Sequence, residues 1–283
     1  MDRRSLLVAL TLLALPPLTA SAEEVWQTIP APPPMPKAHQ SGYAPVNGIE
    51  IWYATYGDPS KPAVVLLHGG LANSNYWGNQ VPAFDKDFYV ITMDSRGHGR
   101  STRNDQPYSY GLMASDVLAL LDYLKIQRAS IVGWSDGGII GLDLAIHHPD
   151  RLNKVFALAA NYIPSGVRED IGQSVVFNRF IEEAGEQYKQ LSKTPDQYQA
   201  FVDQISKMWA TEPNYTKEQL ESIRVPMAIA QGEHDEAIKT SHTEEMAKLI
   251  PGSKLYILPG VSHFAILQNP KLMNQTILDF LKS

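Results

Sequence analysis

The sequence predicts an α/β protein built on a mostly parallel central sheet. Short apolar runs, typical of buried parallel strands, alternate along the chain with segments whose apolar residues have helical spacing. Glycine-rich turns follow several of these runs, where the carboxyl ends of parallel strands meet. The chain has 283 residues, of which 44% are hydrophobic and 19% charged, so it can bury one large core.

The first residues have the pattern of an export signal. Arg3 and Arg4 precede an apolar run over residues 6–18, which is followed by Ala20-Ser21-Ala22, a small-residue cleavage pattern. We therefore predict a signal peptide over residues 1–22 and a secreted or periplasmic protein with no stable membrane anchor after cleavage. The paired arginines leave both the Sec and the twin-arginine routes open.

The composition excludes several classes of protein. The chain has no cysteine, so neither a disulfide framework nor a thiolate nucleophile or metal site can form. Its formal net charge is −6 and it has no basic run, so nucleic acid is not expected as a partner. The expected partner is a small molecule, and the sequence does not indicate an oligomeric state.

Two short regions precede the parallel strands. Residues 23–40 contain Pro30-Ala31-Pro32-Pro33-Pro34-Met35-Pro36, a run that cannot be helical, so we expect this segment to lie extended, as a spacer or along the surface. Residues 43–46 and 50–56 then flank Asn47-Gly48, a strong signal for a two-residue hairpin. The domain is therefore expected to open with antiparallel strands.

The core is predicted over residues 41–161 and 224–283, where strands and helices alternate. The predicted parallel strands cover residues 63–67, 89–93, 129–132, 154–160, 225–230 and 254–258. The predicted helices cover residues 110–124, 139–148, 241–250 and 269–281.

Residues 162–223 interrupt this alternation. The stretch is richer in Gln, Glu, Lys and aromatic residues, with helical patches over residues 170–191 and 195–210. We predict a helical cap inserted between two strands of the core.

The motif Gly133-Trp134-Ser135-Asp136-Gly137-Gly138 lies directly between a predicted strand and a predicted helix. A sharp turn there exposes the Ser135 hydroxyl, and the start of the helix favours developing negative charge. Ser135 is the predicted nucleophile. A serine hydroxyl needs an adjacent base, and that base needs a carboxylate to hold its tautomer. His263 and Asp235 each follow a strand at the same sheet edge as Ser135, and Glu233 and Glu236 are alternatives to Asp235.

From about Tyr43 to the C-terminus, the order Ser135, Asp235, His263 resembles the α/β-hydrolase superfamily. The chain looks like an esterase, lactonase or peptidase-like member, and its elbow is similar to that of valacyclovir hydrolase-like enzymes. The resemblance favours Asp235, because it lies in a Gly-x-x-Asp arrangement like the family's. It also implies an oxyanion hole made by the backbone N–H of Asp136 and that of Gly70 or Leu71. This chemistry needs no cofactor and no metal.

Several side chains allow two interpretations. Five aromatic residues are candidates to line an acyl or alcohol pocket, although such spacings are as typical of a core: Trp134, Tyr162, Phe177, Phe180 and Trp209. The Asp136 carboxylate is expected either to pair with a substrate ammonium group or to make structural hydrogen bonds. A metal site formed by His234, His242 and Asp235 is disfavoured, because the triad already uses that carboxylate. By resemblance, Asp94, Arg96 and His98 form a structural turn with a local salt bridge.

These observations predict an exported serine hydrolase that cleaves a carboxylic ester or lactone through an acyl-enzyme. The same triad would serve an amidase, an aminoacyl-ester hydrolase, a carbon–carbon bond hydrolase or a perhydrolase. A non-catalytic receptor for a small hydrophobic ligand is the alternative from another class. Dehalogenase and epoxide-hydrolase readings are disfavoured, because those relatives place a carboxylate at the position of Ser135.

Overall fold

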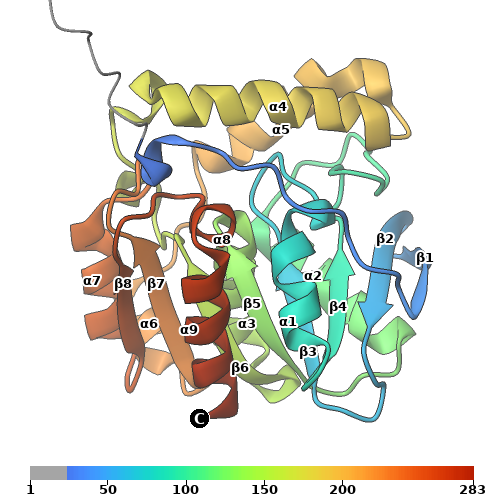
Figure 1. Ribbon diagram of the computed structural model, residues 1–283, viewed down its shortest axis with the longest axis horizontal. Helices are drawn as coiled ribbons and strands as arrows, with labels where there is room; N and C mark the ends of the chain where they lie inside the picture. Colours follow the sequence, from blue (N-terminus) through green and yellow to red (C-terminus); the bar gives the residue numbers. More distant parts are fainter. Residues whose placement is uncertain (1–23) are drawn as a thin grey trace, which may run out of the picture.

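The structure, a computed structural model, describes residues 24–283. It contains one eight-stranded sheet in the order β1-β2-β4-β3-β5-β6-β7-β8, with helices on both faces (Figure 1). The predicted α/β class with a mostly parallel sheet is confirmed. The predicted signal peptide, residues 1–22, lies outside the described residues.

The sheet opens with the predicted hairpin. Strands β1 (Gln40–Val46) and β2 (Ile49–Tyr56) pair antiparallel, and β2 pairs antiparallel with β4. The two turn residues have positive φ, 48° at Asn47 and 74° at Gly48, as a type I′ turn requires. The local sequence therefore determines this part of the fold.

The remaining strands are parallel. Strands β3, β4, β5 and β7 are buried along their whole length, which explains why their sequences are continuous apolar runs. The parallel strands are β3 (Ala63–Leu67), β4 (Tyr89–Met93), β5 (Ala129–Trp134), β6 (Leu152–Leu158), β7 (Met227–Gly232) and β8 (Lys254–Leu258).

Two groups of helices cover the sheet. One group packs together on one face and consists of α2 (Tyr110–Tyr123), α3 (Asp136–His147), α6 (Lys217–Ser222) and α7 (Thr240–Leu249). The other group lies in front of the sheet in Figure 1 and consists of α1 (Val81–Phe84), α8 (Ala265–Gln268) and α9 (Pro270–Lys282). The short helices α1, α6 and α8 were not predicted, because so few residues show no helical period.

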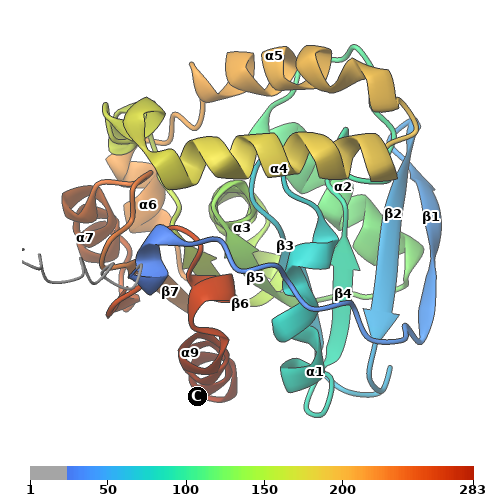
Figure 2. The same cartoon turned by 45° about the horizontal axis from the view of Figure 1, so that its top comes forward.

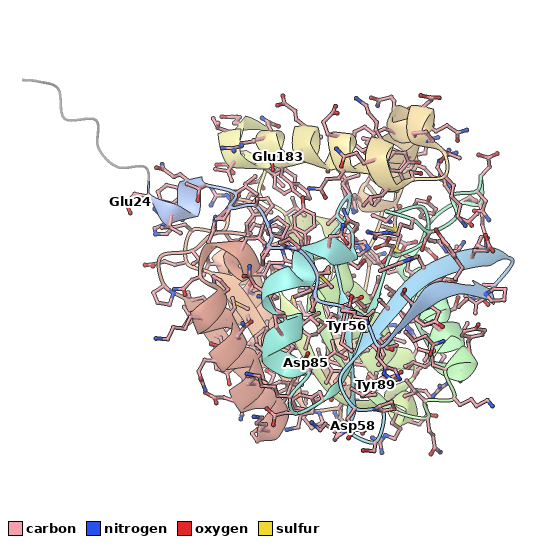
Figure 3. The ribbon with its side chains drawn as sticks, turned by 45° about the vertical axis from the view of Figure 1, so that its right-hand side comes forward. Glu24, Tyr56, Asp58, Asp85, Tyr89 and Glu183 are labelled. Atoms are coloured by element: carbon pink, nitrogen blue, oxygen red, sulfur yellow. The ribbon has the colours of Figure 1, made fainter. Side chains whose placement is uncertain are left out.

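The helices α4 (Val175–Leu191) and α5 (Tyr198–Trp209) lie over the carboxyl ends of the parallel strands (Figure 2). We call these two helices the cap. Their buried residues recur every three or four positions, at Phe180, Ala184 and Tyr188 in α4 and at Phe201, Ile205 and Met208 in α5. Figure 3 shows Glu183 on cap helix α4, whereas Tyr56, which is 3% exposed, lies inside the molecule.

The proline-rich N-terminal segment runs along the surface between the cap and the core (Figure 2). It passes so close to Gly78 that a Cβ there would lie 2.1 Å from the Pro33 carbonyl oxygen. Near its start, the Gln268 side-chain amide donates to the Thr28 carbonyl at 2.8 Å and to the Ser262 hydroxyl at 2.9 Å. Within residues 24–283, no helix is long and apolar enough to cross a membrane.

The turn after β4 makes ion pairs that differ from the expected local bridge. Asp94 pairs with Arg100 at 3.1 Å and also accepts from Ser74. Arg96 instead reaches Asp116 of α2 through two hydrogen bonds of 2.6 and 2.7 Å, and both side chains are 1% exposed. This pair therefore joins the turn to a helix and is buried.

The Asp116→Ala variant is expected to lose about 3–5 kcal/mol of unfolding free energy, because it leaves a buried guanidinium without its partner. Urea denaturation measures the loss, and Asp170→Ala, which breaks the exposed pair with Arg168, is the control with little expected effect. The double variant Arg96→Met/Asp116→Leu should recover much of the stability. Equal stabilities of Asp116→Ala and Asp170→Ala would contradict this account.

Candidate active site

The predicted nucleophile lies on a strained turn between β5 and α3. Ser135 has φ 55° and ψ −118°, an uncommon conformation for a residue with a side chain. Its N–H donates to the Leu158 carbonyl at the end of β6, at 2.8 Å. Its own carbonyl accepts from Gly138 and Ile139 in the first turn of α3. These contacts hold the main chain of the turn from both sides.

Gly133 and Gly137, which flank Ser135 in the motif, have no room for a side chain. A Cβ at Gly133 would lie 2.1 Å from the Gly137 carbonyl oxygen, and one at Gly137 would lie 2.1 Å from the Leu67 carbonyl oxygen. Both distances are far below van der Waals contact. The close packing of β5, α3 and β3 therefore requires glycine at both of these positions of the Gly-x-Ser-x-Gly motif.

The predicted acid and base meet at the same sheet edge. Asp235 follows β7 and His263 follows β8, and Nδ1 of His263 lies 3.1 and 3.2 Å from the two carboxylate oxygens. Oδ1 of Asp235 also accepts the N–H groups of Ala237 and Ile238, at 2.8 and 2.9 Å. The carboxylate is therefore fixed, and Nδ1–H donates to it. That tautomer leaves Nε2 of His263 free to accept a proton.

The charges around His263 favour its protonated form. Burial lowers the pKa of His263, but the carboxylates of Asp235, Glu236 and Asp136 raise it, and the net pKa lies above the ordinary value of 6.5. The imidazole is 3% exposed, so this stabilisation is little screened by solvent. These carboxylates would therefore stabilise an imidazolium cation formed on His263 during a reaction.

The two alternative acids occupy other positions. Oε2 of Glu236 accepts the main-chain N–H of His263 at 3.1 Å, and Oε2 of Glu233 accepts the N–H of Gly260 at 2.9 Å. Both carboxylates therefore contact the backbone of the loop that follows β8. The structure places Asp235 alone against the imidazole, among these three neighbouring acids.

The predicted oxyanion loop lies beside Ser135. A Cβ at Gly69 would lie 3.2 Å from Cβ of Ser135, and Leu71 in the same loop has a positive φ of 62°. His68 holds this loop, because its Nδ1 donates to the Gly69 carbonyl at 2.7 Å while Nε2 accepts the N–H of Ser95 at 3.0 Å. The structure thus brings the loop with Gly70 and Leu71 next to the turn of Ser135 and Asp136.

A cavity of about 420 Å³ opens at this site between the core and the cap. Ser135, Asp136 and His263 lie in its wall. Most of the other lining residues are apolar, and among the described residues that line it there is no Lys or Arg. They are Val167, Ile171, Phe177, Ile181, Trp209, Pro164, Gly172, Ala237 and Ile238, with the polar residues Tyr110, Asn161, Asn178 and Glu212.

Of the five aromatic candidates for the pocket, Phe177 and Trp209 line this cavity. The other three are placed beside it. Trp134 is 1% exposed and donates from Nε1 to the His263 carbonyl at 2.8 Å, and Phe180 packs on Phe264. Tyr162 stacks on His242. These rings fill the space under and around the site, because their backbone positions direct them into the packed interior.

The Asp136 carboxylate makes structural hydrogen bonds, which is one of the two options from the sequence. It accepts from the Tyr110 hydroxyl at 2.9 Å and from Nε1 of Trp209 at 3.1 and 3.0 Å. It therefore links the start of α2, the serine turn and the end of cap helix α5. Burial raises the pKa of Asp136 to about 6, although these hydrogen bonds and the charge of His263 oppose the rise.

The other histidines near Asp235 make different contacts. Nε2 of His242 accepts the N–H of Tyr162 at 3.1 Å, and burial lowers the pKa of His242 to about 4. His234 stacks on Trp26 of the N-terminal segment, with ring centroids 4.6 Å apart. In the described part of the chain, no group of three or more His, Asp or Glu side chains is arranged to hold a metal ion.

Comparison with known proteins identifies the family. The model of the family described as the alpha/beta hydrolase fold matches residues 62–204, just over half of the chain. The chain belongs to this family. Most of its sequence also aligns with named hydrolases, so the protein is an α/β-hydrolase.

Three relatives illustrate the similarity. The chain is 29% identical to 3-oxoadipate enol-lactonase 2 of Acinetobacter baylyi, over 88% of this chain and 99% of that protein. It is 28% identical to the serine hydrolase BPHL of Homo sapiens, over 84% of each chain. The crystal structure of the enol-lactonase from Burkholderia xenovorans LB400 superposes with a TM-score of 0.69 at 27% identity, covering 86% of this chain and all of that one. These relatives support an ester or lactone hydrolase.

Four polar residues in the cavity wall were not predicted: Tyr110, Asn161, Asn178 and Glu212. Asn178 lies on cap helix α4. Tyr110 begins a helix, Asn161 follows β6, and Glu212 follows the cap helix α5. No motif marks any of them. Their place in the cavity depends on how the cap packs on the core, which the sequence pattern does not specify.

The Asp136→Asn variant is expected to be more stable than the wild type at pH 8, by no more than about 3 kcal/mol. The folded-state pKa of about 6 exceeds the ordinary value of 3.8, so the buried charge destabilises the wild type fully above about pH 6. This cost falls as the pH decreases from 6 to 4, and the advantage of Asn should fall with it. Urea denaturation of both proteins across that range measures the difference, and a difference that does not change with pH would contradict the prediction.

Proposed function

We propose that this hydrolase cleaves a carboxylic ester or lactone with Ser135 as nucleophile, His263 as base and Asp235 as the orienting acid. The observation that carries the proposal is that the serine turn and His263, which is paired with Asp235, line one cavity. The named lactonase and serine hydrolase among the relatives support the same reaction class.

In the first half-reaction, Oγ of Ser135 attacks the carbonyl carbon while Nε2 of His263 takes the hydroxyl proton. Asp235 stabilises the imidazolium through the Nδ1–H hydrogen bond. The backbone N–H of Asp136, with that of Gly70 or Leu71, donates to the oxyanion, and each such donor typically contributes about 3–4 kcal/mol to the transition state. The intermediate then expels the alcohol, which receives the proton from His263.

In the second half-reaction, water attacks the acyl-enzyme and His263 takes a proton from that water. The tetrahedral intermediate collapses, the acid leaves, and the proton returns to Oγ of Ser135. With a lactone, the alcohol produced in the first half remains part of the acyl group. The chemistry is otherwise unchanged.

The cavity wall indicates the charge of the substrate. Asp136 and Glu212 both lie in it, and the lining residues described by the structure include no Lys or Arg. Most of the wall is apolar. A substrate that is uncharged and largely apolar therefore fits best, whereas a carboxylate buried there would lack a partner and be repelled.

The kcat of the Ser135→Ala variant on an ester or lactone substrate is expected to fall at least about 1000-fold, because the variant has no nucleophile to form the acyl-enzyme. A serine-directed phosphonate should label the wild type at Ser135 and leave the variant unlabelled. A panel of ester, lactone and amide substrates measures which bond is preferred. Absence of labelling at Ser135, with ligand binding unchanged in the variant, would instead indicate a receptor.

A neutral lactone is expected to be hydrolysed with a kcat/KM at least about tenfold above that of its analogue with a free carboxylate. Glu212→Gln should reduce this ratio, because it removes one negative charge from the wall. Asn178→Ala, which leaves the charge unchanged, is the matched control. A preference for the carboxylated lactone in the wild type would contradict the assignment of substrate charge.

A further inference from the structure

His263 is held at three points. Its Nδ1 lies 3.1 Å from Asp235, its carbonyl accepts from Nε1 of Trp134 at 2.8 Å, and its N–H donates to Oε2 of Glu236 at 3.1 Å. The first contact sets the tautomer of the ring, whereas the other two fix the backbone from opposite sides. The role of Asp235 follows from the triad, but the triad assigns no role to Glu236.

Glu236 is mostly withdrawn from solvent, and burial raises its pKa above the ordinary value of 4.5. A small cavity of about 170 Å³ borders it, and Arg168 and Asp170 also line this cavity. The Arg168 guanidinium is already engaged by Asp170, through two hydrogen bonds of 2.9 and 2.7 Å. Arg168, the one Lys or Arg among the described residues that line this cavity, is therefore paired with another carboxylate. The charge of Glu236 acts on His263.

We propose that Glu236 is a positioning residue for the base: its carboxylate anchors the backbone of His263 and adds a second negative charge beside the imidazole. This inference rests on the proposed function, since it concerns the base of the same reaction. Glu236 does not contact the imidazole nitrogen, so it is not an alternative third member of the triad. It acts through His263.

The negative charge of Glu236 has a direct consequence for the protonation of His263. The groups that face His263 are Asp235 and Glu236 from the loop after β7, Asp136 from the start of α3, and the uncharged rings of Trp134, Phe177 and Phe264. A carboxylate near the ring stabilises the imidazolium and raises the pKa of His263. Since hydrolysis requires neutral His263, Glu236 moves the acid limb of the pH profile upward.

The test compares pH profiles of kcat/KM for three variants with the wild type. Glu236→Gln keeps an oxygen that accepts the His263 N–H but removes the charge, so the acid limb should move down by about 0.5–1 pH unit. The plateau value should stay within about threefold. Glu236→Ala removes the acceptor as well, and its plateau should fall about tenfold in addition, which corresponds to about 1.4 kcal/mol.

Glu233→Gln is the matched control, because Glu233 also accepts a backbone N–H from the same loop, at Gly260, but does not border His263. It should leave the profile unchanged. The inference is overturned if Glu236→Gln superimposes on the wild type, or if Glu233→Gln shifts the limb equally. If Ser135→Ala retains full hydrolysis, the proposed function itself fails. A serine-dependent reaction with no shift in Glu236→Gln refutes only the role of Glu236.

Discussion

The positive φ of Ser135 and the main-chain atoms packed around it determine where the rest of the site can lie. The N–H of Ser135 donates to the Leu158 carbonyl at the end of β6, and Gly137 packs against the Leu67 carbonyl at the end of β3. The turn therefore cannot move relative to the sheet. Because β3, β5 and β6 are parallel neighbours, the loops that follow them lie at the same sheet edge as the Ser135 turn.

The negative charges of the site have two opposing effects. Three carboxylates, from Asp235, Glu236 and Asp136, favour a cation on His263. In the proposed reaction, the same charges would oppose an oxyanion that forms on the substrate. In that reaction, backbone N–H groups and the first turn of α3 would supply the compensating positive potential, without a cationic side chain beside His263.

The predictable part of the molecule is the part encoded locally. The Asn47-Gly48 hairpin, the buried strands and the serine turn each depend on residues adjacent in sequence, and all three were predicted. The approach of Asp235 to His263 could be expected because both follow parallel strands. By contrast, the hydrogen bond from Trp209 to Asp136 joins two segments 73 residues apart, on the cap and on the core.

The same limit explains why only some of the predicted aromatic residues line the cavity. Trp134 and Phe177 are both aromatic residues near the site, yet one is buried beneath His263 and the other faces the cavity. That difference arises from side-chain direction and from the docking of α4, which residue spacing does not report. Likewise Arg96 bonds to a helix and not within its own turn, because the nearer acid is already occupied by Arg100 and Ser74.

The Gln268 amide has a practical implication for handling the protein. It donates to Thr28 near the start of the described chain and to Ser262, the residue immediately before His263, so one side chain links the N-terminal segment to the loop of His263. A tag or fusion partner that displaces the N-terminal segment would therefore also break this contact with the loop of His263. A tag after Ser283 avoids that amide, and is the better choice when the enzyme is to be immobilised or assayed.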